Sequence, residues 1–131
     1  NLATCTVFFQ GTFNDRNEQE ISSLERFTRV GEDEFYGERD RRDYPSPEWK
    51  YNCESALSIQ EVFNQILNIE YPPRVAWIPG AYVSVGRALI RKRPKEYYSN
   101  IMNHLLSLTE AHQTVLAHYM ERAWKAIFTT L

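Results

Sequence analysis

The segment Val115-Leu-Ala-His-Tyr-Met-Glu-Arg-Ala-Trp-Lys-Ala-Ile-Phe128 decides the fold class, because its apolar residues recur at the spacing of an amphipathic helix. Those residues fall in two adjacent rows on one helix: Val115, Leu116, Tyr119, Ala123, Trp124, Ile127 and Phe128. We expect this helix to bury one broad face and to begin after Thr109, whose hydroxyl suits an N-cap. The polar residues then point outward or toward a site; they include Gln113, Glu121, Arg122 and Lys125.

A shorter amphipathic helix comes before it. Pro94 suits its first turn, and its apolar positions are Tyr97, Tyr98, Ile101, Met102, Leu105 and Leu108. Upstream, Arg74–Ile78 and Ala81–Val85 read as strand pieces on either side of Pro79-Gly80, a pair that bends the backbone. The stretch from Arg74 to Leu131 therefore has the pattern of the closing half of an α/β domain.

The amino-terminal region begins with a predicted strand and a predicted helix. Residues Thr4–Gln10 are rich in β-branched and aromatic side chains, which favours a short buried strand. Ser22 and Glu25 have the spacing of a capping box and predict a short helix within Ile21–Val30. The next stretch, Gly31–Asp43, has no apolar period and reads as a long loop. Its carboxylates alternate with arginines, which favours a solvated, self-paired segment over a metal or substrate clamp.

One more helix is expected in the middle of the chain. It starts at Ser55 or Ser58 and runs to about Asn68, because its apolar residues share one stripe: Leu57, Val62, Phe63, Ile66 and Leu67. Pro72-Pro73 forbids its continuation. All of these elements fit a single domain over residues 1–131, since a chain of this length can bury one core.

Composition and charge exclude several classes of protein. The chain has 15 Lys and Arg against 17 Asp and Glu, so its net charge does not attract nucleic acid or an anionic membrane surface. No apolar run approaches the roughly 18 residues of a membrane span. Cys5 and Cys53 fit neither a zinc motif nor a disulfide framework, although one bridge between them stays open. The sequence is compatible with both the cytoplasm and the lumen of the secretory pathway. It gives no indication of the oligomeric state.

The sequence lacks the common catalytic motifs. Gly80 to Arg87 has neither the spacing nor the lysine of a phosphate-binding P-loop. His104, His112 and His118 are not four residues apart, so no zincin-type metal site is predicted. There is no Gly-x-Ser-x-Gly elbow, which leaves nucleophilic hydrolase chemistry unsupported.

Two segments resemble glycosyltransferases of the GT-A fold: Tyr71 to Val85, which is similar to a stretch beside the acceptor, and Glu110 to Phe128. The chain is still more similar to an uncharacterised family, domain of unknown function 3431. That similarity rests on Phe8-Phe9-Gln10-Gly11, on Gly80 to Tyr98, and on the ending Glu121-Arg122-Ala123-Trp124-Lys125-Ala126-Ile127-Phe128. The resemblance implies an α/β fold with a GT-A-like (Rossmann-like) mixed sheet and C-terminal helices. It also implies that the chain, which begins with Asn1, corresponds to the second half of such a domain or to a reduced relative.

The resemblance further implies an enzyme of the hexosyltransferase type, which uses a nucleotide-sugar donor and a carbohydrate or glycan acceptor. Gln10, Gly11 and Asp15 would then lie at the carboxyl edge of the sheet, where open α/β folds bind ligands. Enzymes of this type place there an Asp-x-Asp motif that holds Mn²⁺ or Mg²⁺, whereas this chain has Gln10-Gly11-Thr12. Without the carboxylates, Lys or Arg side chains, another cation or helix amides must meet the diphosphate charge. Metal dependence and catalysis both become open questions.

The acceptor side of the resemblance rests on two groups of residues. Trp77, Pro79, Gly80 and Ala81 could form the wall of a sugar site or a plain structural bend. Glu110 and His112, in the first turn of the last helix, are candidates for the general base. A glutamate at a helix start is also what the helix dipole alone would favour.

Glu121 is assigned to the substrate site by the family likeness, and its structural alternative is a surface pair with Lys125. The competing function is a non-catalytic carbohydrate-binding or interaction domain, which the missing Asp-x-Asp motif favours.

Overall fold

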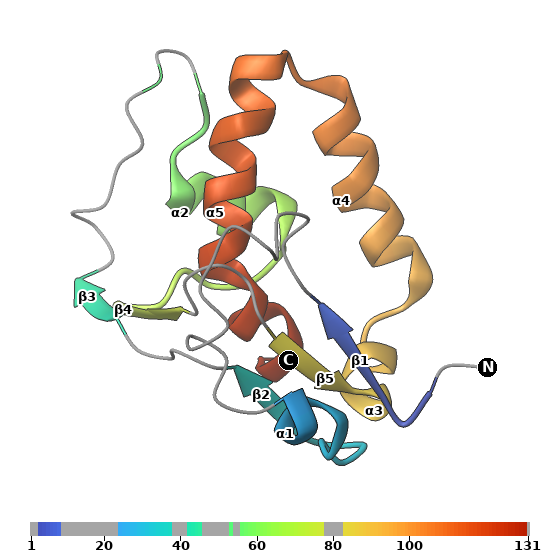
Figure 1. Ribbon diagram of the computed structural model, residues 1–131. Coiled ribbons are helices and arrows are strands. Elements are labelled where there is room, and N and C mark those ends of the chain that lie inside the picture. Colours follow the sequence, from blue (N-terminus) through green and yellow to red (C-terminus); the bar gives the residue numbers. More distant parts are fainter. Residues whose placement is uncertain are drawn as a thin grey trace.

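Helices α4 (Lys95–Ser107) and α5 (Glu110–Thr129) run side by side in opposite directions in this computed structural model (Figure 1). The structure describes residues 3–8, 24–37, 42–45, 53, 56–77 and 83–130. Thr109 is the N-cap of α5, as predicted, and its hydroxyl oxygen accepts a hydrogen bond from the amide of His112 at 3.4 Å. Pro94 is the N-cap of α4, one residue ahead of its predicted place in the first turn.

The predicted broad face of α5 is confirmed. Its buried residues are Val115, Leu116, Tyr119, Met120, Ala123, Ile127 and Phe128, and only Trp124 of the predicted set is half-buried. Helix α4 has no fully buried residue, and Met102, predicted on its apolar face, is exposed. Helix α4 packs against α5 with one face only, so the opposite face of α4 stays accessible.

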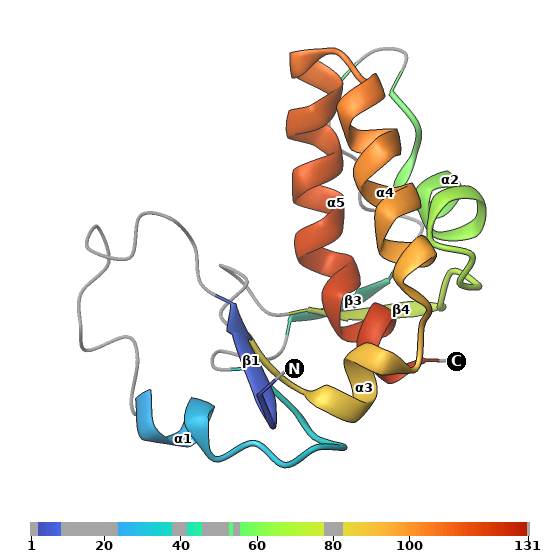
Figure 2. The same cartoon turned by 90° about the vertical axis from the view of Figure 1, so that its right-hand side faces the viewer.

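Three short strands form an antiparallel sheet at one end of this helix pair (Figure 2). β1 (Cys5–Phe8) and β2 (Phe35–Gly37) both pair with the central strand β5 (Val83–Gly86), in the order β1-β5-β2. All four residues of β5 are buried, because Val83 and Val85 face the hydrophobic core while α1 contacts the strand on the side of Ser84. Ser84 is the buried polar residue of this strand, and its hydroxyl donates a hydrogen bond to the carbonyl of Phe27 at 2.7 Å.

The expectation of an uninterrupted loop over Gly31–Asp43 is wrong. β2 lies inside this stretch, and β3 (Arg42–Pro45) begins there and pairs antiparallel with β4 (Arg74–Trp77). Neither strand has a readable period because each is only three or four residues long, and pairing with a distant partner stabilises it. The two strand pieces predicted around Pro79-Gly80 are β4 and β5, and they belong to different sheets.

The predicted middle helix begins where Ser58 caps it. Ser58 and Glu61 form a reciprocal capping box that opens α2 (Ile59–Glu61), which continues into the π-helical segment η4 (Val62–Ile66). The helical segment ends at Ile66 with Leu67 as its C-cap, and the next residue, Asn68, has a φ of 51°. The amide of Ile69 then bonds back to the carbonyl of Phe63 at 2.9 Å. This left-handed C-terminal motif ends the helix before Pro72-Pro73 is reached, whereas the prediction attributed the helix end to those prolines.

Two further helices complete the described elements. α1 (Leu24–Thr28) is a short helix within Ile21–Val30, as predicted, and the proposed cap Ser22 lies outside the described residues. α3 (Arg87–Arg91), which was not predicted, follows β5 directly. At that junction a Cβ added to Gly86 would lie 2.2 Å from the carbonyl oxygen of Glu32. Only a glycine fits this close approach.

Among the described residues, one large hydrophobic cluster joins η4, β5, α3 and α5. Phe63, Leu67, Val85 and Ala123 have no exposed surface in this core. The expected α/β class is thus confirmed, with a small antiparallel sheet and C-terminal helices. Among the described helices, none has both the length and the apolar character needed to cross a membrane.

Candidate functional site

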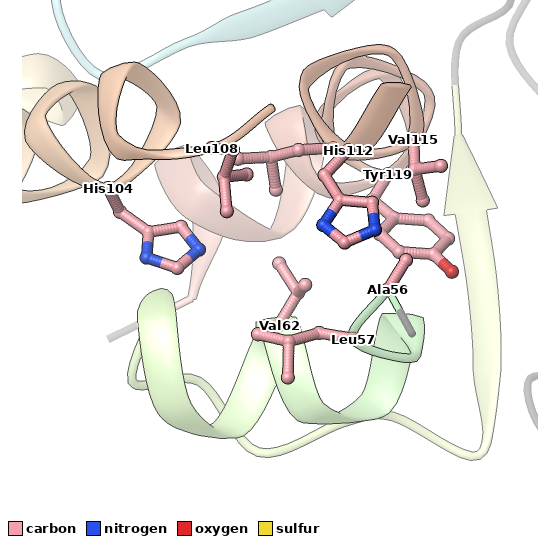
Figure 3. A pocket seen from close by; sticks show the side chains of 9 residues that line it. Ala56, Leu57, Val62, His104, Leu108, His112, Val115 and Tyr119 are labelled. Carbon is pink, nitrogen blue, oxygen red and sulfur yellow. The ribbon is translucent and has the colours of Figure 1, made fainter. Parts of the chain in front are cut away.

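A hollow of about 270 Å³ lies between α4, α5 and the start of α2, and two histidines line it (Figure 3). His104 comes from the last turn of α4, and His112 from the first turn of α5. We call this hollow the histidine pocket; its other lining residues are Ala56, Leu57, Val62, Leu108, Val115, Leu116 and Tyr119.

The corner between the two helices positions both imidazoles. Ser107 donates a hydrogen bond to the carbonyl of His104 at 2.6 Å, and Gln113 donates to the carbonyl of Leu108 at 3.2 Å. Together with the Thr109 cap, these bonds satisfy groups that a helix end otherwise leaves unpaired. The two half-buried imidazoles are therefore held at adjacent helix ends and point into the same hollow (Figure 3).

The rest of the pocket wall is mostly apolar. Val62, Val115 and Leu116 are each 2% exposed, and the ring of Tyr119 is buried beside His112 (Figure 3). A neutral imidazole has one donor and one acceptor nitrogen, so it can bind a hydroxyl group or accept its proton. The pocket can therefore bind a small ligand that has both an apolar face and hydroxyl groups.

Of the two predicted base candidates, His112 lines the histidine pocket and Glu110 does not. Glu110 is exposed on the outer side of the first turn of α5. A carboxylate there interacts favourably with the helix dipole, as the structural alternative had it.

Glu121 lies nine residues beyond His112, or about 14 Å along the axis of α5. Its carboxylate is 3.6 Å from the guanidinium of Arg122, which also donates a hydrogen bond to the carbonyl of His118 at 2.8 Å. Both side chains are largely buried, with 21% of Glu121 and 11% of Arg122 exposed. Glu121 is therefore not part of the histidine pocket, and its pairing with Lys125 stays a prediction.

The other predicted site residues fall on parts of the chain that the structure does not describe. Gln10, Gly11, Asp15, Pro79, Gly80 and Ala81 lie outside the described residues, as does the side chain of Trp77 at the end of β4.

The described end of β1 lies far along α5 from the pocket. The ring of Phe8 stacks on Trp124, with the ring centroids 6.4 Å apart. Trp124 is about 18 Å along α5 from His112. The described part of β1 and the histidine pocket therefore contact different levels of the same helix.

His104 is the pocket residue that sequence reasoning did not select. His104 was considered only as a zinc ligand at i, i+4 spacing, and it lies eight residues before His112, which was also a candidate base. A usable signal was their position on either side of the Thr109 cap, because a sharp turn between antiparallel helices brings such positions together. The described side chains contain no group of three or more His, Cys, Asp or Glu that could hold a metal ion.

Comparison with known proteins identifies a family but no characterised relative. No curated protein and no solved structure matches the chain. A family model does match, and it covers residues 33–131, which include both histidines of the pocket and all of α3, α4 and α5. Since this match extends over more than half of the sequence, the chain belongs to the family described as Protein of unknown function (DUF3431).

Proposed function

We propose that the protein is a glycosyltransferase-like enzyme that binds a carbohydrate acceptor in the histidine pocket and uses His112 as the general base. The supporting observation is the pairing of two imidazoles with an apolar wall in one small hollow. A volume of about 270 Å³ suits one sugar ring better than a long oligosaccharide. The apolar face of the ring would pack on Tyr119 and Val62, while its hydroxyl groups bond to the imidazoles.

The proposed reaction is transfer of a glycosyl group to an acceptor hydroxyl. The hydroxyl proton passes to the unprotonated ring nitrogen of His112, and the oxygen forms a bond to the anomeric carbon of the nucleotide sugar. The bond from that carbon to the diphosphate oxygen breaks, and its electron pair leaves with the diphosphate. His104 orients the acceptor. A positioned base of this kind typically contributes about 10²- to 10⁴-fold to the rate.

The donor half of the proposal rests on the resemblance to GT-A domains. A diphosphate site at Gln10, Gly11 and Asp15, with Mn²⁺ or Mg²⁺, stays a prediction because these residues lie outside the described part of the chain. The GT-A-type mixed sheet is likewise a prediction, since the described strands all pair antiparallel.

A specific observation favours a second function, a non-catalytic carbohydrate-binding domain. The described end of β1, which precedes the predicted donor residues in the sequence, contacts α5 about 18 Å along the helix from His112, whereas transfer requires the donor to meet the acceptor hydroxyl beside that base. In addition, no carboxylate is among the described residues that line the histidine pocket. Both facts suit binding without transfer.

Histidine-ring NMR of the intact chain tests the pocket directly, because the sequence has three histidines. A panel of monosaccharides should shift the ring signals of His104 and His112. The signal of His118, which is on α5 but does not line the pocket, is the internal control. Saccharides that shift no histidine signal, or only that of His118, would remove the basis for both proposed functions.

Turnover separates the enzyme from the binding domain. Release of nucleoside diphosphate from a panel of nucleotide sugars, with and without Mn²⁺, should fall at least about 100-fold in His112→Gln and should be unchanged in His118→Gln. Saccharide binding without turnover across the panel would leave the binding domain and reject the enzyme.

A further inference from the structure

The exposed large apolar side chains gather on one face. Among the described residues they are Phe8, Met102 and Leu106, which are 39%, 53% and 69% exposed. Phe8 and Met102 line one hollow of about 500 Å³, and Leu106 follows Met102 by one turn of α4. Isolated exposed apolar residues are ordinary, but a contiguous cluster of them marks an interaction surface.

The wall of this hollow offers nothing to a polar ligand. None of its described lining residues is charged, and the hydroxyl of Tyr98 is already donated to the carbonyl of Ile90 at 2.7 Å. The rings of Trp124 and Phe128 stack nearly parallel, with centroids 5.9 Å apart, and close the inner side. An occupant therefore has to be apolar where it meets this wall.

Three exposed cations lie where α3 ends and α4 begins: Arg91, Lys92 and Lys95. Lys95 lies two turns before Met102, so the two residues share one side of α4. Arg91 and Lys92, at the end of α3, are also exposed and line a neighbouring hollow together with Glu32 and Arg87, whose side chains form an ion pair with each other. No ion pair between described residues includes Arg91, Lys92 or Lys95. The nearest carboxylate on α4, that of Glu96, is about 100° around the helix from Lys95.

We propose that α3, α4 and Phe8 form a docking surface for an anionic lipid bilayer. Helices α3 and α4 and strand β1, which ends at Phe8, lie on the side of the molecule that faces the viewer in Figure 2. Arg91, Lys92 and Lys95 contact the lipid phosphates, and Met102 and Leu106 enter the boundary between headgroups and acyl chains. The charge and the apolarity of the surface both match this partner, because interfacial binding combines buried apolar area with attraction to anionic lipid. The net charge of the whole chain, -2, conceals these locally unpaired cations.

Vesicle co-sedimentation of the intact chain tests this surface. The protein should bind vesicles of phosphatidylcholine with about 30% phosphatidylserine and should bind pure phosphatidylcholine poorly. Its binding to the anionic vesicles should weaken as the salt concentration rises. Arg91→Gln with Lys92→Gln should lower the partition coefficient roughly thirtyfold. The matched control, Arg29→Gln with Arg74→Gln, removes two exposed cations from the turn after α1 and from β4, and should have a much smaller effect.

A second pair of variants tests the apolar part of the surface. Met102→Ser with Leu106→Ser should lower binding about tenfold or more. Both side chains are exposed, so the variants should keep the circular dichroism spectrum of the parent. The proposal is overturned if the parent does not bind anionic vesicles, or if it binds neutral vesicles equally well. It is also overturned if both pairs of variants bind like the control, or if Met102 and Leu106 instead mediate self-association in sedimentation experiments.

Discussion

Replacing Trp124 with alanine tests the packing of β1 against α5. The Trp124 ring stacks on Phe128, with centroids 5.9 Å apart and planes at 11°, and on Phe8, at 6.4 Å and 12°. Each aromatic pair contributes about 0.5–1.5 kcal/mol beyond area burial, so the two pairs together account for about 2 kcal/mol. A fully buried tryptophan would cost about 3–5 kcal/mol on truncation to alanine. Trp124 is only half-buried and borders a hollow, so we expect a loss of about 2–3 kcal/mol in the free energy of unfolding.

Urea unfolding measures this loss. With a slope of about 2 kcal/mol per M, typical for a domain of this size, the midpoint should fall by about 1–1.5 M at an unchanged slope. The control is Leu106→Ala, because Leu106 is 69% exposed and its truncation should change stability by no more than about 0.5 kcal/mol.

Two results would refute the reasoning about Trp124. A loss below about 0.5 kcal/mol would mean that the stack contributes nothing, and one above about 4 kcal/mol would mean that Trp124 is a fully packed core residue. A double-mutant cycle with Phe8→Ala isolates the contact between β1 and α5, and its coupling energy should be about 0.5–1.5 kcal/mol. A coupling of zero would show that β1 does not pack there.

Three further predictions concern stability. Gly86→Ala should destabilise the protein by about 3 kcal/mol or more in urea unfolding, because the new Cβ would lie 2.2 Å from a backbone oxygen; an unchanged midpoint would contradict this junction. Ser58→Ala should lower Tm by about 3–5 °C through loss of the cap. Hydrogen bonds from the amide and hydroxyl of Ser58 lower the pKa of Glu61, so the part of the Tm difference that comes from the hydroxyl-carboxylate bond is present above the ordinary glutamate pKa of about 4.3 and is lost as pH falls through the lower folded value. The part that comes from the bond between the Glu61 amide and the Ser58 hydroxyl remains in acid, so a Tm difference that does not narrow at all at low pH would contradict this reasoning. Burial raises the pKa of Tyr97 and of Tyr98, against a lowering contribution from a nearby arginine, so their contribution to stability is complete below about pH 10 and is lost at higher pH. Ultraviolet titration, compared between the parent and single Phe variants, should show each of these two tyrosines ionising above the ordinary tyrosine pKa of about 10; ionisation at or below that value would contradict the prediction.

Long periodic segments carried most of the fold that the sequence could predict. The apolar rows of α5 and the Thr109 cap are local patterns, and both are confirmed. β2 could not be predicted in this way, because three residues, Phe35 to Gly37, carry no period and become a strand only through β5. The missing α3 has a similar cause, since its five residues follow a strand without a side-chain cap.

The candidate site was predictable only in part. His112 was selected from its place in the first turn of a helix, whereas His104 became relevant only when the turn at Thr109 brought α4 beside it. The exposed cations Arg91 and Lys92 could not be recognised as part of one surface, because the net charge of the whole chain averages over surfaces that face different directions. Both omissions arise from tertiary placement, which a pattern along the chain does not carry.

The central place of β5 has a consequence for the order in which the protein folds. Its bonded neighbours lie about 80 and 50 residues earlier in the chain, while α4 and α5 adjoin through a two-residue corner. Closing such long loops costs entropy before any strand contact forms, so we expect the helical pair to fold first and the sheet last. During synthesis, β1 would wait without a partner until Val83 to Gly86 leave the ribosome. Pulse-labelled hydrogen exchange should therefore protect the amides of α5 before those of β1; simultaneous protection would show instead that helices and sheet form in one step.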